Sequence, residues 1–144
     1  MATSNRSTIR KAIAGSLAAS LTTAQAVVDH QKSATSDVSP LVRVMSYGSG
    51  RPPSVAAGEV TRHLILVQSW VLYSEIPGKW TEADAEDSLD AIEQEVAAWV
   101  EANQQSPGVW KTIRYARESD VTVVKDNGEA WLVENVVLEV RAVD

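Results

Sequence analysis

Few residues of this 144-residue sequence are suited to catalysis or metal binding. It contains no cysteine, which excludes disulfides, thiolate metal sites and a cysteine nucleophile. Its two histidines, His30 and His63, have no spacing that pairs them as metal ligands. The segment Tyr47-Gly48-Ser49-Gly50 lacks the pattern of a nucleophile elbow, and no glycine-rich segment ends in the Lys-Ser/Thr of a phosphate loop. We therefore expect no catalytic centre, no metal and no cofactor.

Carboxylates are concentrated between Lys79 and Lys111, in a segment that contains Glu82, Asp84, Glu86, Asp87, Asp90, Glu93 and Glu95. On a helix, Glu86 and Asp90 share a face and repel each other mildly, while acids in the first turn favour the helix N-terminus. Three interpretations remain open: a solvated acidic face, an interface with a basic patch on a neighbour, or paired carboxylates that act on a divalent metal. A metal site usually needs ligands from several elements, and one helix supplies only one row.

Five tryptophans and no phenylalanine are present. Trp70 and Trp99 lie on predicted apolar faces and are expected in the core, whereas Trp80, Trp110 and Trp131 lie at the edges of predicted elements. Tryptophan is enriched at interface hot spots, so one of the latter three is a candidate anchor for a neighbouring molecule, and for each the other interpretation is packing within its own domain. Together with residues from predicted loops, a turn and the acidic segment, the candidate assembly contacts are Tyr47, Arg51, Trp80, Glu86, Asp90, Trp110, Asn127 and Trp131.

Two helices are predicted to position these residues. The first carries one stripe of apolar residues at every fourth position, with Ser4 or Ser7 as its N-cap: Ile9, Ile13, Leu17 and Leu21. The second is capped by Thr81 and ends between Asn103 and Pro107. Its core face has helical spacing and contains Ala85, Leu89, Ile92, Val96 and Trp99.

The rest of the chain predicts strands at residues 26–30, 40–45, 60–73, 109–115, 120–125 and 130–143. Asp126-Asn127-Gly128 predicts a tight hairpin turn. The strand at 60–73 is apolar on both faces, so we expect helices to cover one face and a second subunit to cover the other. Residues 46–58 are rich in glycine and proline and predict an irregular loop, either simply exposed or an assembly arm that orders on a partner.

These elements predict one α+β domain over residues 1–144. Its sheet is mixed or mostly antiparallel and flanked by two α-helices, in the order α-β-β-β-α-β-β-β. The formal net charge of −6 lacks the basic footprint of a protein that binds nucleic acid. No stretch is long and apolar enough to span a bilayer, so we expect no membrane association.

Four apolar patterns follow one another in a recognisable order: Ile9-Arg10-Lys11-Ala12-Ile13, Pro40-Leu41-Val42-Arg43-Val44, Leu89-Asp90-Ala91-Ile92 and Val136-Val137-Leu138-Glu139-Val140-Arg141. With the short strand at 26–28 and the long one at 60–73, this succession resembles the tail terminator (tail completion) proteins of siphophages. More loosely, it resembles the minor tail and neck proteins related to them. The resemblance covers most of the chain, except residues 31–39 and 46–58.

The resemblance implies a homo-oligomeric ring, commonly a hexamer, at the neck end of the virion tail, assembled in the cytoplasm of the host bacterium. Such a ring stops polymerisation of the major tail tube protein and presents a head–tail joining surface to the connector or stopper protein. Genome DNA passes through its channel without specific binding. The family uses no cofactor and catalyses no reaction.

Two other functions remain open from the sequence. One is a head-completion, stopper or other neck connector protein, and the second is a small cytosolic enzyme or acid-binding adaptor. A monomer that binds a small molecule would favour the latter. Because a ring brings acidic helices together, we also expect salt or divalent cations to ease ring closure.

Overall fold

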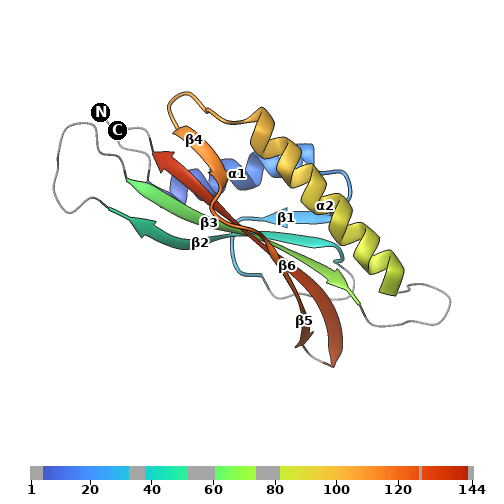
Figure 1. Cartoon of the computed structure of the whole chain (residues 1–144). Coiled ribbons are helices and arrows are strands. Elements are labelled where there is room, and N and C mark those ends of the chain that lie inside the picture. Colours follow the sequence, from blue (N-terminus) through green and yellow to red (C-terminus); the bar gives the residue numbers. More distant parts are fainter. Residues whose placement is uncertain (1–4, 33–37, 52–60, 74–81, 127, 143–144) are drawn as a thin grey trace.

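A computed structural model describes residues 5–32, 38–51, 61–73, 82–126 and 128–142. The elements follow the chain as α1 (Arg6–Ser20), β1 (Ala26–Val28), β2 (Leu41–Gly50), β3 (Arg62–Leu72), α2 (Glu82–Ala102), β4 (Trp110–Tyr115), β5 (Asp120–Asp126) and β6 (Glu129–Ala142). The predicted α+β class is confirmed, with a mixed sheet of six strands and two helices (Figure 1).

The six strands form one curled sheet in which β1, β2, β3 and β6 are successive neighbours (Figure 1). The β1–β2 pairing is parallel, and every other pairing of the described strands is antiparallel. The remaining edge of β6 is long enough for two partners. Its C-terminal part pairs with β4, and its N-terminal part pairs with β5.

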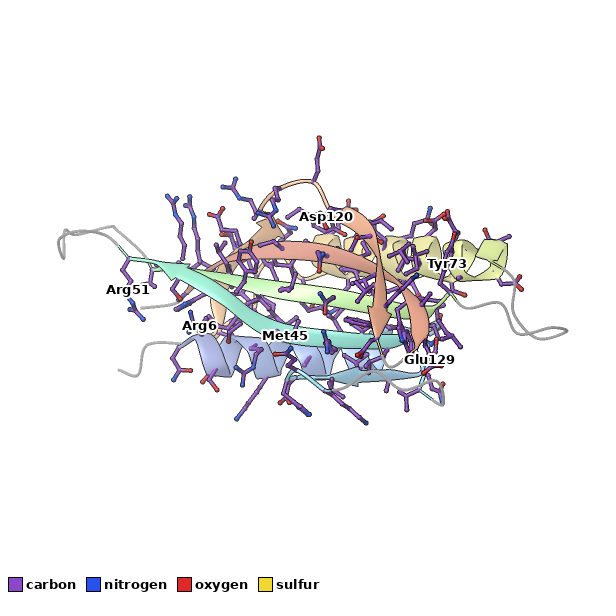
Figure 2. All side chains as sticks on the ribbon, turned by 90° about the horizontal axis from the view of Figure 1, so that it is seen from below. Arg6, Met45, Arg51, Tyr73, Asp120 and Glu129 are labelled. Carbon is purple, nitrogen blue, oxygen red and sulfur yellow. The ribbon has the colours of Figure 1, made fainter. Side chains whose placement is uncertain are left out.

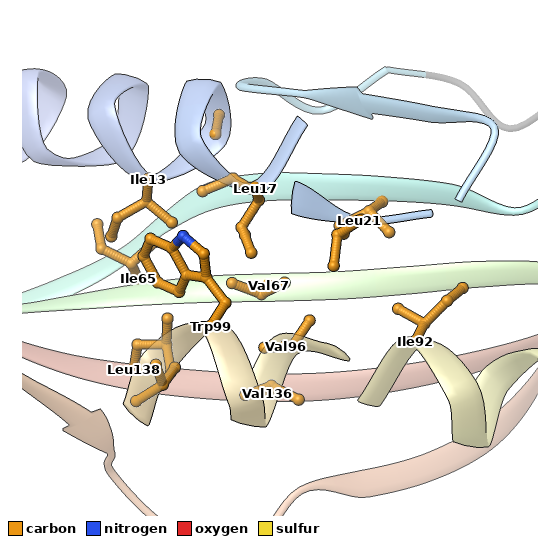
Figure 3. Close-up of a cluster of buried hydrophobic side chains, with 14 of the residues drawn as sticks. Ile13, Leu17, Leu21, Ile65, Val67, Ile92, Val96, Trp99, Val136 and Leu138 are labelled. Atoms are coloured by element: carbon orange, nitrogen blue, oxygen red, sulfur yellow. The ribbon is translucent and has the colours of Figure 1, made fainter. Parts of the chain in front are cut away.

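Both helices lie on the same face of the sheet, as expected for helices that cover one face of β3, and they do not flank the sheet on two sides. One buried cluster joins α1, α2 and this face, and Figure 3 shows the side chains meeting there. The indole Nε1 of Trp99 on α2 donates a hydrogen bond to Ser16 Oγ on α1 at 2.8 Å. The apolar stripe of each helix is narrow, so two helices side by side are needed to cover one face of the sheet.

Local boundaries differ from the prediction at several places, and the strand predicted at 26–30 ends at Val28. The N-cap of α1 is Asn5, whose Oδ1 accepts a hydrogen bond from the Thr8 amide at 2.8 Å, instead of Ser4 or Ser7. β2 continues to Gly50, paired with Arg62 across a bulge at residues 46–48, so the first part of the predicted loop is strand. Residues 52–58 lie outside the described residues. The ladder to β3 outweighs the local preference of the glycines.

The opposite face of the sheet carries a second, smaller buried cluster. It contains Leu41, Trp70, Leu72, Trp131 and Val133. The rings of Trp70 and Trp131 meet edge to face with centroids 5.9 Å apart. Trp70 is 8% exposed and Leu72 is 3% exposed. At this end of β3, the apolar surface expected to need a second subunit is therefore covered within the chain.

A polar ladder crosses the same face beside this cluster. Arg43, Gln68, Asn135 and Asp120 are aligned in register on β2, β3, β6 and β5. Arg43 Nη2 donates to Gln68 Oε1, Gln68 Nε2 donates to Asn135 Oδ1 at 2.7 Å, and Asn135 Nδ2 donates to Asp120 Oδ1 at 2.9 Å. Trp70 Nε1 donates to the same Gln68 oxygen at 2.6 Å. The ladder thus fixes the register of four strands through side chains.

Replacing Gln68 tests this ladder. We expect Gln68→Met to lower the free energy of unfolding by about 2–4 kcal/mol, because the buried Arg43 and Trp70 side chains lose their common acceptor. Gln94 is exposed on α2, and Gln94→Met is a matched control expected to change stability by less than about 0.5 kcal/mol. Urea denaturation measures both. Equal effects of the two substitutions would contradict a stabilising role for the ladder.

Candidate assembly surfaces

Three arginines meet in an open pocket of about 490 Å³ at the end of the sheet where β2 finishes. Arg6 and Arg10 are four residues apart on α1, which places them on one side of the helix. Arg51 follows the last residue of β2, and Figure 2 shows it at the same end of the molecule as Arg6. We call this site the arginine pocket. Its lining residues are Asn5, Arg6, Ser7, Arg10, Ser46, Ser49 and Arg51.

Serine hydroxyls of β2 hold two of the three guanidinium groups. Arg6 Nη1 donates to Ser49 Oγ at 3.1 Å, and Arg10 Nη1 donates to Ser46 Oγ at 3.0 Å. Ser49 Oγ also lies 2.8 Å from Nδ1 of His63, whose side chain is buried beneath the pocket wall. Neutral hydroxyls orient the arginines but leave their charge in place.

No carboxylate of the described residues forms an ion pair with Arg6, Arg10 or Arg51. Asp29 lies across an adjoining cavity from Arg10, but it pairs with His30 at 3.0 Å, and this hydrogen bond is the main reason that its pKa is lowered. The Nε atom of Arg10 is shielded from solvent and has no hydrogen-bond partner. The pocket therefore holds a concentration of positive charge within a chain that is acidic as a whole.

The acidic surface lies toward the other end of β3, where α2 begins (Figure 1). Glu86, Asp87 and Asp90 are exposed on the N-terminal half of α2. Glu86, Asp90 and Glu93 follow one another at spacings of four and three, which forms one stripe along the helix. Glu93 Oε2 accepts a hydrogen bond from the Tyr115 hydroxyl at 2.7 Å, so the stripe faces β4 and β5. We call Glu86, Asp90 and Glu93 the acidic stripe.

Glu134 on β6 adds a buried carboxyl beside the acidic stripe. Its side chain is 6% exposed, and this burial raises its pKa. The negative charges of Glu93, Asp90 and Asp120 raise it further, while a hydrogen bond from Ser119 Oγ at 2.7 Å opposes the shift.

β5 is an edge strand that pairs with β6 and with no other described strand. Two of its residues, Val121 and Val123, are 53% and 51% exposed. Val121 lies opposite Glu134 in register, so the exposed valines adjoin the carboxyls next to α2. We call the outer backbone edge of β5, together with Val121 and Val123, the β5 edge. Such edges are ready templates for pairing with another chain.

The predicted assembly residues do not come together in one place. Tyr47 lies on β2, is 48% exposed and accepts a hydrogen bond from Arg117 Nη2 at 3.2 Å. Arg51 lines the arginine pocket, whereas Glu86 and Asp90 lie on the acidic stripe. Trp80 and Asn127 lie outside the described residues.

Trp110 and Trp131 are buried, so their side chains are not available to a neighbouring molecule. Trp110 is 3% exposed, packs edge to face on Trp99 and donates from Nε1 to the Asn103 carbonyl at 3.0 Å. Trp131 is fully buried because β6 begins at Glu129 and is paired on both sides, which makes it an interior position. Of the two interpretations open from the sequence, both tryptophans therefore follow packing within their own domain, and they are withdrawn as candidate assembly contacts.

The arginine pocket and the polar ladder were not identified from the sequence. The pocket had one detectable signal, the spacing of four between Arg6 and Arg10 on a predicted helix. Its third arginine and its serines come from another element, and only the fold joins them. Within the described part of the chain, no three His, Asp or Glu side chains gather in a way that could hold a metal ion, and no helix there is long and apolar enough to cross a membrane.

Comparison with known proteins gives no assignment: the sequence matches no protein-family model, and no curated protein shows significant similarity to it. Functional conclusions therefore depend on the surfaces described above and on the resemblance of the sequence pattern.

The raised pKa of Glu134 predicts a pH dependence of stability. The folded state binds the carboxyl proton of Glu134 more tightly than the unfolded state, in which the pKa has its ordinary value of 4.5. The free energy of unfolding therefore falls as the pH rises from 4.5 through the raised pKa of the folded state. Glu134→Gln removes this decrease, so its stability relative to the parent protein should increase from pH 4 to pH 8. Thermal unfolding across this pH range measures the effect. Glu101→Gln, at an exposed position of α2, is the control. The same pH trend in both variants would contradict the assignment to Glu134.

Proposed function

We propose that this chain is a non-enzymatic structural subunit that associates with copies of itself into a ring, and that the ring caps the completed tail tube of a long-tailed bacteriophage. The observation that carries self-association is the β5 edge, where Val121 and Val123 are more than half exposed beside unpaired backbone groups. An edge strand with exposed apolar side chains gains both hydrogen bonds and apolar burial when another chain pairs with it.

A ring follows from association through two different surfaces of each copy. A ring requires the β5 edge of one copy to contact a different surface of the next copy, because pairing of two β5 edges with each other would give a closed dimer. Head-to-tail contacts of this kind close into rings when the rotation between copies permits. A closed ring buries the β5 edge of every copy, whereas an open head-to-tail chain leaves the edge of its terminal copy exposed.

The role at the tail end is supported by the resemblance of the apolar pattern to tail terminator proteins. In this role the ring stops polymerisation of the major tail tube protein and offers a joining surface to the head–tail connector or stopper protein. Genome DNA passes through the channel of the assembled virion, and the net charge of −6 disfavours adhesion of its phosphates. The ring needs no cofactor for this task.

Removing the exposed methyl groups of β5 tests self-association. We expect the double variant Val121→Thr and Val123→Thr to dissociate at about ten-fold higher protein concentration than the parent chain, because it loses apolar area while keeping strand propensity. Sedimentation velocity over a concentration series measures the change. Thr122→Ser, on the other face of the same strand, is the control. A parent chain that remains monomeric at high concentration would contradict the proposed ring.

The tail function is tested in a phage that lacks this gene product. Without the ring, tube polymerisation has no stop and no joining surface, so we expect overlong tails separated from heads in negative-stain electron micrographs. Supplying the intact protein should restore uniform tails joined to heads. Tails of normal length joined to heads in its absence would exclude the proposed role.

A further inference from the structure

We propose that the arginine pocket is the receiving half of the interface between copies, and that it binds the carboxylates of Glu86 and Asp90 on α2 of a second copy. This inference rests on the proposed self-association and names its chemical contact. The pocket itself is the starting point, because none of its arginines forms an ion pair with a carboxylate of the described residues, and Asp29, which attracts Arg10 at longer range, is paired with His30.

The chemistry of the pocket favours an oxyanion ligand. Guanidinium groups bind carboxylates and phosphates through paired hydrogen bonds in one plane. Arg6 and Arg10 each have one nitrogen fixed by a serine, which orients the group and leaves other N–H donors available. Arg51, which follows the last residue of β2, contributes a third charge, whereas Arg10 Nε is shielded from solvent and is not accessible to a ligand. A ligand with several carboxylate oxygens would satisfy donors that the chain leaves unpaired.

The spacing of the acids matches the spacing of the arginines. Arg6 and Arg10 are four residues apart on α1, and Glu86 and Asp90 are four residues apart on α2. Each pair therefore presents its charges along one side of a helix, with Cβ atoms about 6 Å apart. Two helices that approach side by side can form both ion pairs together.

The geometry of the monomer directs this contact to another copy. The arginine pocket lies where β2 ends, and the N-terminal half of α2 lies toward the opposite end of the sheet (Figures 1 and 2). A copy therefore cannot neutralise its own pocket with its own acidic stripe. Two acidic proteins repel each other in most orientations, and this head-to-tail approach brings opposite charges together.

This contact reverses the salt effect expected from net charge alone. Screening would weaken attraction between the pocket and the acids, so salt should dissociate the ring instead of easing its closure. The β5 edge supplies an apolar contribution that salt screens little.

Reciprocal charge reversal tests the interface. We expect Arg6→Glu with Arg10→Glu, and separately Glu86→Arg with Asp90→Arg, each to weaken self-association at least ten-fold, because like charges then meet. An equimolar mixture of the two variants should associate again, since each supplies the surface that the other needs. The fourfold variant should also recover. Native mass spectrometry and sedimentation velocity measure assembly, and circular dichroism checks that each variant is folded.

Several results would overturn the inference. One is that either charge-reversed double variant associates as strongly as the parent chain. Another is that neither the mixture nor the fourfold variant associates again, although circular dichroism shows that the proteins are folded. A third is that the parent pocket binds inorganic phosphate saturably, while neither phosphate nor charge reversal changes assembly. The pocket would then be a site for a free anion. If the β5 double variant fails to assemble but charge reversal has no effect, self-association stands and only the contact between the arginine pocket and the acidic stripe is excluded. If the mixture of charge-reversed variants assembles again, but phage tails form normally without this protein, the interface stands and only the tail function is excluded.

Discussion

The structure depends on the pairing of β3 with β6 and on the burial of both faces of that pair. β3 and β6 are joined along their length in antiparallel register, from Arg62–Arg141 to Leu72–Trp131. Side chains from the two strands alternate between the helix-covered cluster and the smaller cluster on the opposite face. Because each residue step changes the face, a shift of one position would exchange every buried apolar side chain for its neighbour. The helices, the polar ladder and the outer strands all depend on this register.

The polar and charged side chains fall into separate groups on the fold. The polar side chains opposite the helices, from Arg43 to Asn135, hydrogen-bond to one another along the ladder. In contrast, the arginine pocket has no described carboxylate as an ion-pair partner, and acids gather on the side of α2 that faces β5. A monomer with unlike charges at separate ends and a free strand edge has the features of an assembly subunit.

Prediction from sequence succeeded where one local period controls the structure. The stripe Ile9, Ile13 and Leu17 and the core face of α2 are buried as expected, because helix spacing decides burial when a sheet lies beneath. Prediction failed where a neighbouring strand decides. Trp131 seemed to lie at an edge, but pairing on both sides of β6 places it inside. Residues 46–50 seemed irregular, but the ladder to β3 holds them extended.

The sequence by itself determined the α+β class, the two amphipathic helices and the surplus of apolar strand surface, since these depend on residue periods and composition. Only the tertiary structure decided that part of the surplus is buried within the chain and that Arg6, Arg10 and Arg51 form one pocket. These properties arise from contacts between residues far apart in the chain. Local preferences do not encode such contacts, because the free energy of burial depends on which surfaces the strand order brings together.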